Sequence, residues 1–513
     1  MTIHTPFPQL QHAVAALALA AGAVALVACS PAAPEGNTTP AADIGVGADT
    51  AAAPLPAPVV GGEVPTWLGP GSATDSAAGF AKVLAGGAAA GALVIAPLGP
   101  SVAWDLAGRL MIAGGATVAS GATDPLDLGS IGAASAKVLF LDPQARTLAA
   151  GPAPLATSRA WAASTRTTMA IIVAGGLAPS NDGFTAAGAV AWVDAVGHGL
   201  LGTPADAAAA DLAFPRAATT AVRLFEGSDL ALIVGGHGDG FAPQSWELAS
   251  ADKGVLAQGL LTGPRRNHGL VRVPAGAAGS AVLVGGENGG GAISDFELIR
   301  FDAAGKVARA DHPDPDWQPT RQAFPSGVGL TLPGVAFVDR PGARLIAIAG
   351  GFSDLAHSQP SNALLLFDVD RGQWVTGTFE PSKALASGGA WVGVPQAFAL
   401  QEARGAPLMA SVGAGGATRL LIAGGVGKGG DTLDSAEVWE PDELADAIAS
   451  AVHTGVTLTW TPKLAVIEAR LPDGGRAHAQ MAVHPAGYVA IVGGVSRKAG
   501  ALEGRADVLF WRP

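Results

Sequence analysis

Short runs of apolar residues that end in two glycines recur along this chain. Four or five apolar residues bounded by glycines are typical of a buried strand and are too short for a helix. A unit that repeats at similar intervals indicates a repeat architecture. Seven copies occur at intervals of 50 to 74 residues, and their diglycines are Gly114 and Gly115, Gly175 and Gly176, Gly235 and Gly236, Gly285 and Gly286, Gly350 and Gly351, Gly424 and Gly425, and Gly493 and Gly494.

A second apolar stretch follows each diglycine and ends on a large residue, usually with an acid after it. Examples are AVAWVD, which ends at Asp194, and LLLFD, which ends at Asp368. Ahead of most diglycine runs an arginine opens a further strand, although the first and sixth copies have no clear one. These leading arginines are Arg159, Arg216, Arg266, Arg321 and Arg476.

This order of features resembles kelch repeats, in which an Arg-led strand precedes an apolar strand ending in Gly-Gly. The resemblance covers roughly residues 76–513. It implies an all-β fold, a kelch-type β-propeller of about seven four-stranded blades, similar to the central domain of galactose oxidase. In such a ring each blade covers the faces of its neighbours. Six or eight blades remain alternatives, because VLAGG at 83–87 and PVVGG at 58–62 are weaker copies.

The last copy ends at Pro513 after its third strand, so its fourth strand must come from elsewhere. Residues 78–85 (AGFAKVLA) are suited to supply it from the N-terminal side. A blade shared by both ends of the chain hides two sheet edges and closes the ring.

The first 28 residues resemble a bacterial lipoprotein signal peptide. Sixteen uncharged residues, Ala13 to Ala28, end directly before Cys29 in the motif Leu26-Val27-Ala28-Cys29. No Lys or Arg precedes this apolar run. The apolar run fits a signal peptide and is short for a membrane span. The resemblance implies lipidation of Cys29, and Ser30 after it favours the outer membrane. Residues 29–75, rich in Pro and Ala, are expected to form a flexible tether.

Charge and cysteine content exclude several classes of function. The net charge is −12 and no basic run is present, which excludes a nucleic-acid partner. Cys29 is the only cysteine, so no intramolecular disulfide and no cysteine-based metal site is possible. The copper-radical site of galactose oxidase cannot form either, because Tyr488 is the only tyrosine. The histidines show no metal-ligand spacing, and we expect neither a metal nor a cofactor.

Loops that follow the diglycines are expected to share one face with the starts of the Arg-led strands. Polar residues in these loops are His237, Asp239 and Glu287. Together with the five leading arginines they form a weak candidate binding face, since loops on a rigid scaffold commonly carry function. The arginines themselves have two interpretations: they line the channel and meet an anion, or they bond to neighbouring backbone carbonyls. The second is favoured, because a residue that recurs once per blade is explained by the blade.

Three hypotheses of function follow, and none assigns a catalytic residue. The first is a monomeric, non-enzymatic module that recognises a protein or a glycan at the cell envelope and meets the membrane only through its lipid. The second is a sugar-modifying enzyme that resembles a sialic-acid mutarotase. The third is a structural component of an envelope or coat. Acids or histidines that converge with arginines in the channel would favour the enzyme, and a channel filled by Val, Leu and Ala would favour the binding module.

Overall fold

The structure is a computed structural model. It describes residues 63–68, 80–83, 94–127, 130–181, 183–195, 199–201, 211–239, 242–275, 278–301, 320–339, 344–370, 372–375, 377–379, 399–414, 417–439, 458–460, 469–498 and 500–513. The regular elements in these ranges are all strands. Within the same ranges, no helix has the length and apolarity needed to cross a membrane. The predicted signal peptide and Cys29 lie outside the described residues.

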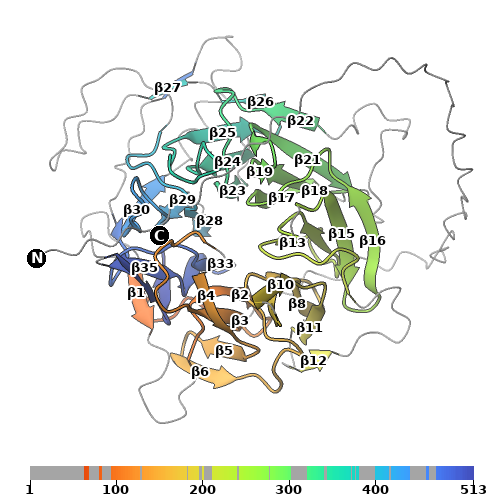
Figure 1. Ribbon diagram of the computed structural model, residues 1–513. Coiled ribbons are helices and arrows are strands. Elements are labelled where there is room, and N and C mark those ends of the chain that lie inside the picture. The colour runs from red at the N-terminus through yellow and green to blue at the C-terminus, as the bar shows by residue number, and fades with distance from the viewer. Residues whose placement is uncertain are drawn as a thin grey trace, which may run out of the picture. The chain divides into compact units, whose positions relative to one another are not determined.

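Seven antiparallel sheets of four strands each form the blades of a β-propeller (Figure 1), which confirms the predicted fold class. From the centre outward, blade 1 contains β2 (Leu98–Trp104), β3 (Leu110–Val118), β5 (Val138–Asp142) and β6 (Thr147–Ala150). Blade 2 contains β7 (Ala163–Arg166), β8 (Ala170–Ala174), β11 (Val190–Asp194) and β12 (Leu200–Leu201). Blade 3 contains β13 (Thr220–Arg223), β14 (Ala231–Val234), β15 (Ser245–Ser250) and β16 (Gly254–Leu260).

The remaining four blades follow the same order. Blade 4 contains β17 (Gly269–Ala275), β18 (Ala278–Val284), β21 (Asp295–Phe301) and β22 (Thr320–Ala323). Blade 5 contains β23 (Gly334–Val338), β24 (Leu345–Ala349), β25 (Leu364–Asp368) and β26 (Gln373–Trp374). Blade 6 contains β28 (Leu408–Ala414), β29 (Ala417–Ala423), β30 (Ser435–Trp439) and β32 (Ala469–Arg470). Blade 7 contains β33 (Gln480–His484), β34 (Tyr488–Val492), β37 (Val508–Trp511) and β1 (Phe80–Val83).

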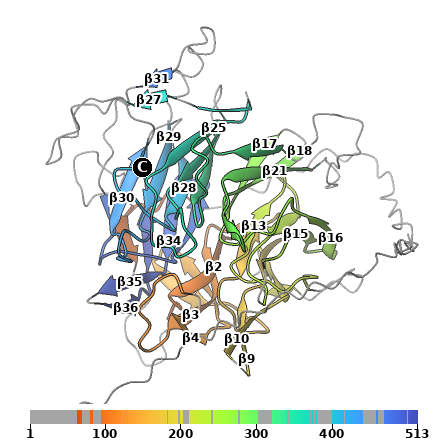
Figure 2. The same ribbon diagram turned by 45° about the horizontal axis from the view of Figure 1, so that its top comes forward.

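Short additional strands follow several of the diglycines. Figure 2 shows β4, β9, β10, β35 and β36 at the same end of the ring. We call this end the diglycine face. These strands are β4 (Ile131–Ala134), the hairpins β9 (Leu177–Ser180) with β10 (Gly183–Ala186), β19 (Glu287–Asn288) with β20 (Gly291–Ala292), and β35 (Val495–Lys498) with β36 (Ala501–Gly504). A separate parallel pair joins β27 (Gly377–Phe379) to β31 (Leu458–Trp460).

Both ends of the chain build blade 7, as the sequence predicted. Strand β1 pairs antiparallel with the C-terminal strand β37, with Phe80 opposite Trp511 and Val83 opposite Val508. The inner strands β2, β7, β13, β17, β23, β28 and β33 contact one another in turn, and β33 contacts β2 again. The ring is therefore closed, and its seven blades settle the count in favour of seven.

Residues ahead of the closing strand also pack on the propeller. Trp67 donates its indole N–H to the carbonyl oxygen of Pro143 at 2.7 Å, and the Arg146 guanidinium lies 4.2 Å from the centroid of the Trp67 ring. Leu68 is buried in the core that blades 1 and 7 share. The packed part of the chain thus includes residues that lie ahead of the predicted boundary at residue 76.

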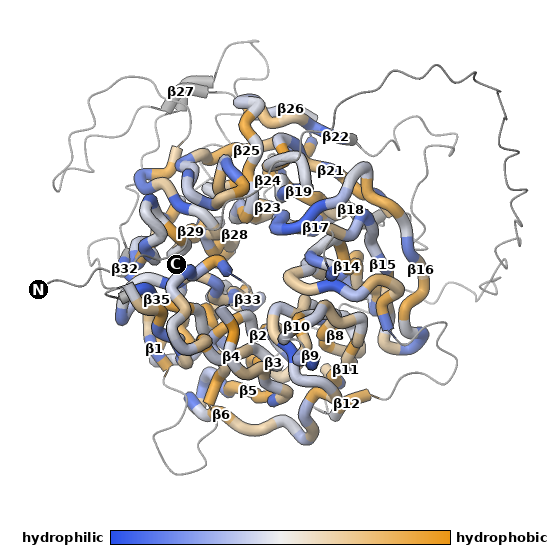
Figure 3. Tube along the Cα trace, viewed as in Figure 1, coloured by the Kyte–Doolittle hydropathy of each residue, from blue (hydrophilic) through white to orange (hydrophobic). Residues whose placement is uncertain are grey.

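The core of the protein lies between neighbouring blades. The second strand of each blade is apolar and buried, as in AIIVA of β8 and LIAIA of β24 (Figure 3). Large residues of the third strands reach across the seams: Trp192 packs against Ile233 of the next blade, and the rings of Phe296 and Phe367 lie 4.7 Å apart between blades 4 and 5. Each such side chain contributes about 1.5–3 kcal/mol when fully buried.

The diglycines connect consecutive blades. In each pair both residues have positive φ, and the N–H of the second glycine donates to the carbonyl of the residue that leads into the next blade. The N–H of Gly176 donates to the carbonyl of Arg216 at 2.8 Å, and the N–H of Gly494 donates to that of Pro97 at 2.7 Å, which joins the last blade to the first. A Cβ on Gly175 would lie 2.3 Å from the Arg216 carbonyl oxygen. Only glycine satisfies both the left-handed backbone and this close approach.

Candidate functional site

A pocket of about 680 Å³ lies at the diglycine end of the central channel. The inner strands β2, β7, β13, β17 and β33 contribute to its walls, together with loops that follow four diglycines. We call it the mouth pocket. Its polar lining includes His237, Arg266, Asn267, His268, Glu287, His357 and His478. Its volume is in the range typical of small-molecule sites.

Two repeat positions bring these side chains together. The first is the residue directly after the diglycine, which is apolar in five blades and polar only where His237 and Glu287 stand. The second lies two residues after the residue whose carbonyl accepts from the diglycine of the preceding blade. Its backbone is left-handed in every blade. Its seven members are Gly99, Trp161, Ala218, Asn267, Leu332, Ala406 and His478. Backbone hydrogen bonds connect some of these residues between neighbouring blades. For example, the Leu332 N–H donates to the Asn267 carbonyl oxygen at 2.7 Å.

Glu287 is the centre of the polar cluster. It is 3% exposed, and one carboxylate oxygen accepts from Arg266 Nε at 2.8 Å and from Asn267 Nδ2 at 3.2 Å. The other oxygen lies 3.0 Å from Thr331 Oγ1 and 3.2 Å from His357 Nε2. Burial pushes the pKa of Glu287 up, but the hydrogen bonds from His357 and Thr331 and the charge of Arg266 outweigh it, so its pKa lies below the ordinary value. The carboxylate is therefore ionised at neutral pH and holds Arg266 and His357 in place.

Three histidines of the pocket, His237, His268 and His478, are held in the neutral form. Burial lowers the pKa of His237, whose Nε2 lies 2.9 Å from Asn267 Oδ1. Burial also lowers the pKa of His268 to about 3 and that of His478 to about 4. A neutral imidazole offers one N–H donor and one acceptor, so each ring can bond to a hydroxyl group in either sense.

Three polar atoms on the walls of this pocket have no hydrogen-bond partner. They are the indole nitrogen Nε1 of Trp161, Nε2 of His478 and Nδ1 of His268, and all three are buried. The rings of Trp161 and His478 meet edge to face, with their centroids 5.8 Å apart. An unmade hydrogen bond at a buried polar group costs about 1–3 kcal/mol, so such groups normally have a partner.

The predicted site residues separate into distinct groups. His237, Glu287 and Arg266 line the mouth pocket. Asp239 lies elsewhere on the same face, where it accepts from Thr185 Oγ1 at 2.7 Å and from the Ala186 N–H at 2.8 Å. Those two hydrogen bonds hold the pKa of Asp239 below its ordinary value.

The buried arginines serve the repeat. Arg159, Arg216 and Arg476 are fully buried, and each donates from Nη1 to the carbonyl of the first glycine in the diglycine of its own blade, at Gly175, Gly235 and Gly493. Arg216 and Arg476 also pair with buried acids of the third strand, Glu247 at 2.6 Å and Asp507 at 2.6 Å. Their guanidinium groups therefore bond within the blade, and these arginines do not line the mouth pocket.

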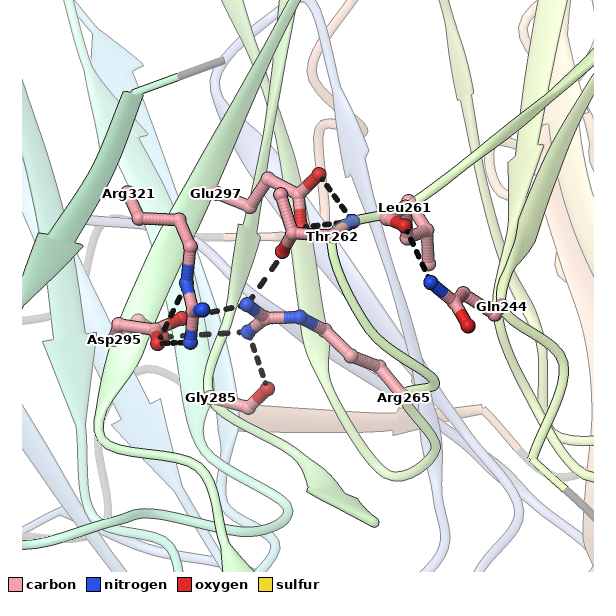
Figure 4. Close-up of polar contacts among 8 residues, drawn as sticks. All are labelled: Gln244, Leu261, Thr262, Arg265, Gly285, Asp295, Glu297 and Arg321. Atoms are coloured by element: carbon pink, nitrogen blue, oxygen red, sulfur yellow. Dashed lines mark hydrogen bonds and ion pairs between the residues drawn. The ribbon is translucent and has the colours of Figure 1, made fainter. Parts of the chain in front are cut away.

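Two leading arginines were assigned wrongly from the sequence, and a third was missed. In blade 4 the repeat position belongs to Arg265, one residue before Arg266, and Figure 4 shows the Arg265 guanidinium between Gly285 and Asp295. Arg321 lies on the outer strand β22, where it pairs with the same aspartate; the leading position of blade 5 holds Leu330 instead. Blade 6 does have a leading arginine, Arg404, which bonds to the carbonyl of Gly424 at 3.0 Å and pairs with Glu437.

The sequence interpretation missed Trp161, Asn267, His268 and His357. For Trp161, Asn267 and His268 the signal is a departure from the repeat, because aromatic or polar residues stand in blades 2 and 4 where most equivalent residues of other blades are small or apolar. His357 lies in the loop after the diglycine of blade 5. Positions at which a sequence breaks its own pattern are where function is expected.

The structure identifies the class of fold to which this protein belongs. Among the described residues, no group of three or more His, Cys, Asp or Glu is arranged to hold a metal ion. No protein-family model matches the chain, and no curated protein is similar to it in sequence. The fold defines the protein as a seven-bladed β-propeller with a polar pocket at one end of its channel.

Proposed function

We propose that this chain is an exported, lipid-anchored envelope protein whose kelch-type propeller binds a glycan in the mouth pocket. The observation that carries the proposal is the set of three unpartnered buried atoms on Trp161, His268 and His478. They offer a donor and two neutral imidazole nitrogens beside the flat face of an indole ring. Sugars present hydroxyl groups that both donate and accept, together with apolar C–H faces, and they match such a wall.

Replacement of Trp161 by phenylalanine tests the binding proposal. The variant keeps an aromatic wall but removes the indole N–H, and we expect glycan affinity to fall about tenfold, the equivalent of one lost hydrogen bond of about 1.4 kcal/mol. A glycan array identifies a binding sugar first, and isothermal titration calorimetry then compares the variants.

Trp192→Phe is the matched control. Trp192 also has an unpartnered Nε1, but it lies in the core between blades 2 and 3 and outside the pocket. We expect Trp192→Phe to bind the sugar as the parent does. Equal affinity of Trp161→Phe and the parent would contradict the proposal.

A second candidate function is acid/base chemistry on a sugar, as in the resemblance to a sialic-acid mutarotase. The convergence of Glu287, Arg266, His237 and His357 in one pocket favours it, because histidines and a carboxylate within hydrogen-bond reach of each other can hold and move a proton. Proton NMR of the bound sugar distinguishes the candidates. Faster exchange between anomers that Glu287→Gln abolishes and Glu503→Gln retains indicates the enzyme, and unchanged exchange indicates the binding module.

The lipid anchor has its own test. We expect Cys29→Ala to move the protein from the membrane fraction to the soluble fraction of its native host, because no acyl chain can be attached without the thiol. Ser30→Ala serves as the control and is expected to stay with the membrane. Fractionation followed by immunoblotting measures the distribution, and a Cys29→Ala variant that remains in the membrane would rule the anchor out.

A further inference from the structure

Three arginines meet farther along the channel, away from the mouth pocket. Arg166 ends β7, Arg223 ends β13 and Arg272 lies in β17, so they stand on the inner strands of three consecutive blades. All three line a second pocket of about 310 Å³, which we call the arginine pocket. On β13, residues 220 and 221 line the mouth pocket and residues 222 and 223 line the arginine pocket, which places the two one after the other along the channel.

The positive charge of this pocket is only partly neutralised. Glu226 pairs with Arg223 at 2.5 Å and with Arg272 at 2.9 Å, and its side chain is 58% exposed. The nearby carboxylate of Asp105 is already paired with Arg109 at 2.7 Å. Three guanidinium groups against the single carboxylate of Glu226 leave two positive charges (3 − 1 = 2).

Two of the guanidinium groups also have unmade hydrogen bonds. Nη1 of Arg166 and Nη1 of Arg223 are buried and have no partner. Burial lowers the pKa of Arg166, and the neighbouring charge of Arg223 lowers it further. Arginine nonetheless stays protonated in proteins. Repulsion between the two like charges is unfavourable, and so are buried N–H groups without acceptors. An oxyanion between the two groups would remove both penalties.

We propose that the arginine pocket binds a phosphate dianion, either free or as a monoester. Two unbalanced positive charges match a doubly charged group, and guanidinium forks match the geometry of tetrahedral oxyanions. The arginine pocket adjoins the mouth pocket and shares Val102, Ser164 and Met481 with it, but its three arginines do not line the mouth pocket.

Thermal unfolding and calorimetry with inorganic phosphate test this site at pH 7.5 and constant ionic strength. We expect phosphate to raise the Tm of the parent protein relative to chloride, since a ligand that binds only the native state stabilises it. Arg166→Met is expected to weaken phosphate binding about tenfold or more. In chloride alone the same variant is expected to be no less stable than the parent, because burial and the neighbouring charge of Arg223 both oppose the charged form of Arg166.

Controls separate this site from general charge effects. Arg470→Met removes the same charge from the outer strand of blade 6, where the side chain is 65% exposed, and it is expected to bind phosphate as the parent does. Acetate, a monoanion, is expected to bind about tenfold more weakly or worse than phosphate. If Arg166→Met does not fold, Arg272→Gln takes its place with the same expected loss.

Several outcomes would overturn the proposal. They are a parent protein that phosphate does not stabilise beyond chloride, an Arg166→Met variant that keeps full affinity, and equal binding of acetate and phosphate. Glycan binding measured on Arg166→Met reports on the mouth pocket alone, so failure of one site is distinguishable from failure of the other. Vesicles that contain phosphatidic acid, compared with glycerol phosphate, show whether the monoester is a lipid headgroup or a soluble compound.

Discussion

Replacement of Arg216 by methionine is expected to lower the free energy of unfolding by about 3–5 kcal/mol. The Arg216 and Glu247 side chains are completely buried and form an ion pair at 2.6 Å. Nη2 of Arg216 also bonds to Ser245 Oγ at 2.8 Å, and its Nη1 donates to the carbonyl of Gly235 at 3.2 Å. Methionine fills much of the volume but leaves the Glu247 carboxylate buried beside uncharged groups. Urea denaturation of the parent and the variant measures the difference.

Arg159 provides a matched comparison in the preceding blade. It is equally buried, but its guanidinium donates to the backbone carbonyls of Gly175 and Ala189, at 3.3 and 2.6 Å. Arg159→Met leaves neutral acceptors unpaired, at an expected cost of about 1–3 kcal/mol. In the Arg216→Met background, a further Glu247→Gln change is expected to restore part of the stability, since the amide oxygen still accepts from the Ala213 N–H. Equal costs for the two arginine variants would show that the ion pair adds nothing to the carbonyl bonds.

These arginines also show where the sequence interpretation reached its limit. The diglycine strands, the apolar third strands and the closing strand were all predicted, because each feature recurs or completes a pattern that recurs. The register of the leading arginines was not, since Arg265 and Arg266 are adjacent and chemically identical. Only the structure shows that the first is buried against Asp295 and the second faces the mouth pocket. Arg321 was misplaced for a related reason: an outer strand also carries an arginine that pairs with this aspartate.

The candidate site was harder to predict from the sequence than the fold. His237 and Glu287 were noticed as polar residues after their diglycines, yet they are 50 residues apart in the sequence. Their connection runs through Asn267, which bonds to both of them. His357 comes from a third blade and reaches Glu287 across the ring of loops. A site made of single residues from several repeats has no local spacing to detect, so its recognition required the ring itself.

Substitution of the first glycine of a pair is expected to have a comparably large effect. In Gly285→Ala the new Cβ would lie 2.3 Å from the carbonyl oxygen of Leu330, and the backbone φ is +56°. That carbonyl also accepts from the N–H of Gly286 at 2.8 Å, so moving it away breaks the bond between blades 4 and 5. A left-handed alanine costs about 1 kcal/mol or more, and the displaced carbonyl adds to this. We expect a loss of about 2–4 kcal/mol in the free energy of unfolding.

Gly289→Ala isolates the steric cause of this loss. Gly289 follows four residues later in an exposed turn, and a Cβ there meets nothing within 4 Å. We expect its unfolding free energy to stay within about 0.5 kcal/mol of the parent value. If Gly285→Ala were as stable as Gly289→Ala, the diglycine would not be needed for close approach between blades. Because the same approach recurs at all seven seams, including Gly493 against Pro97, that result would remove the physical reason for the repeat itself.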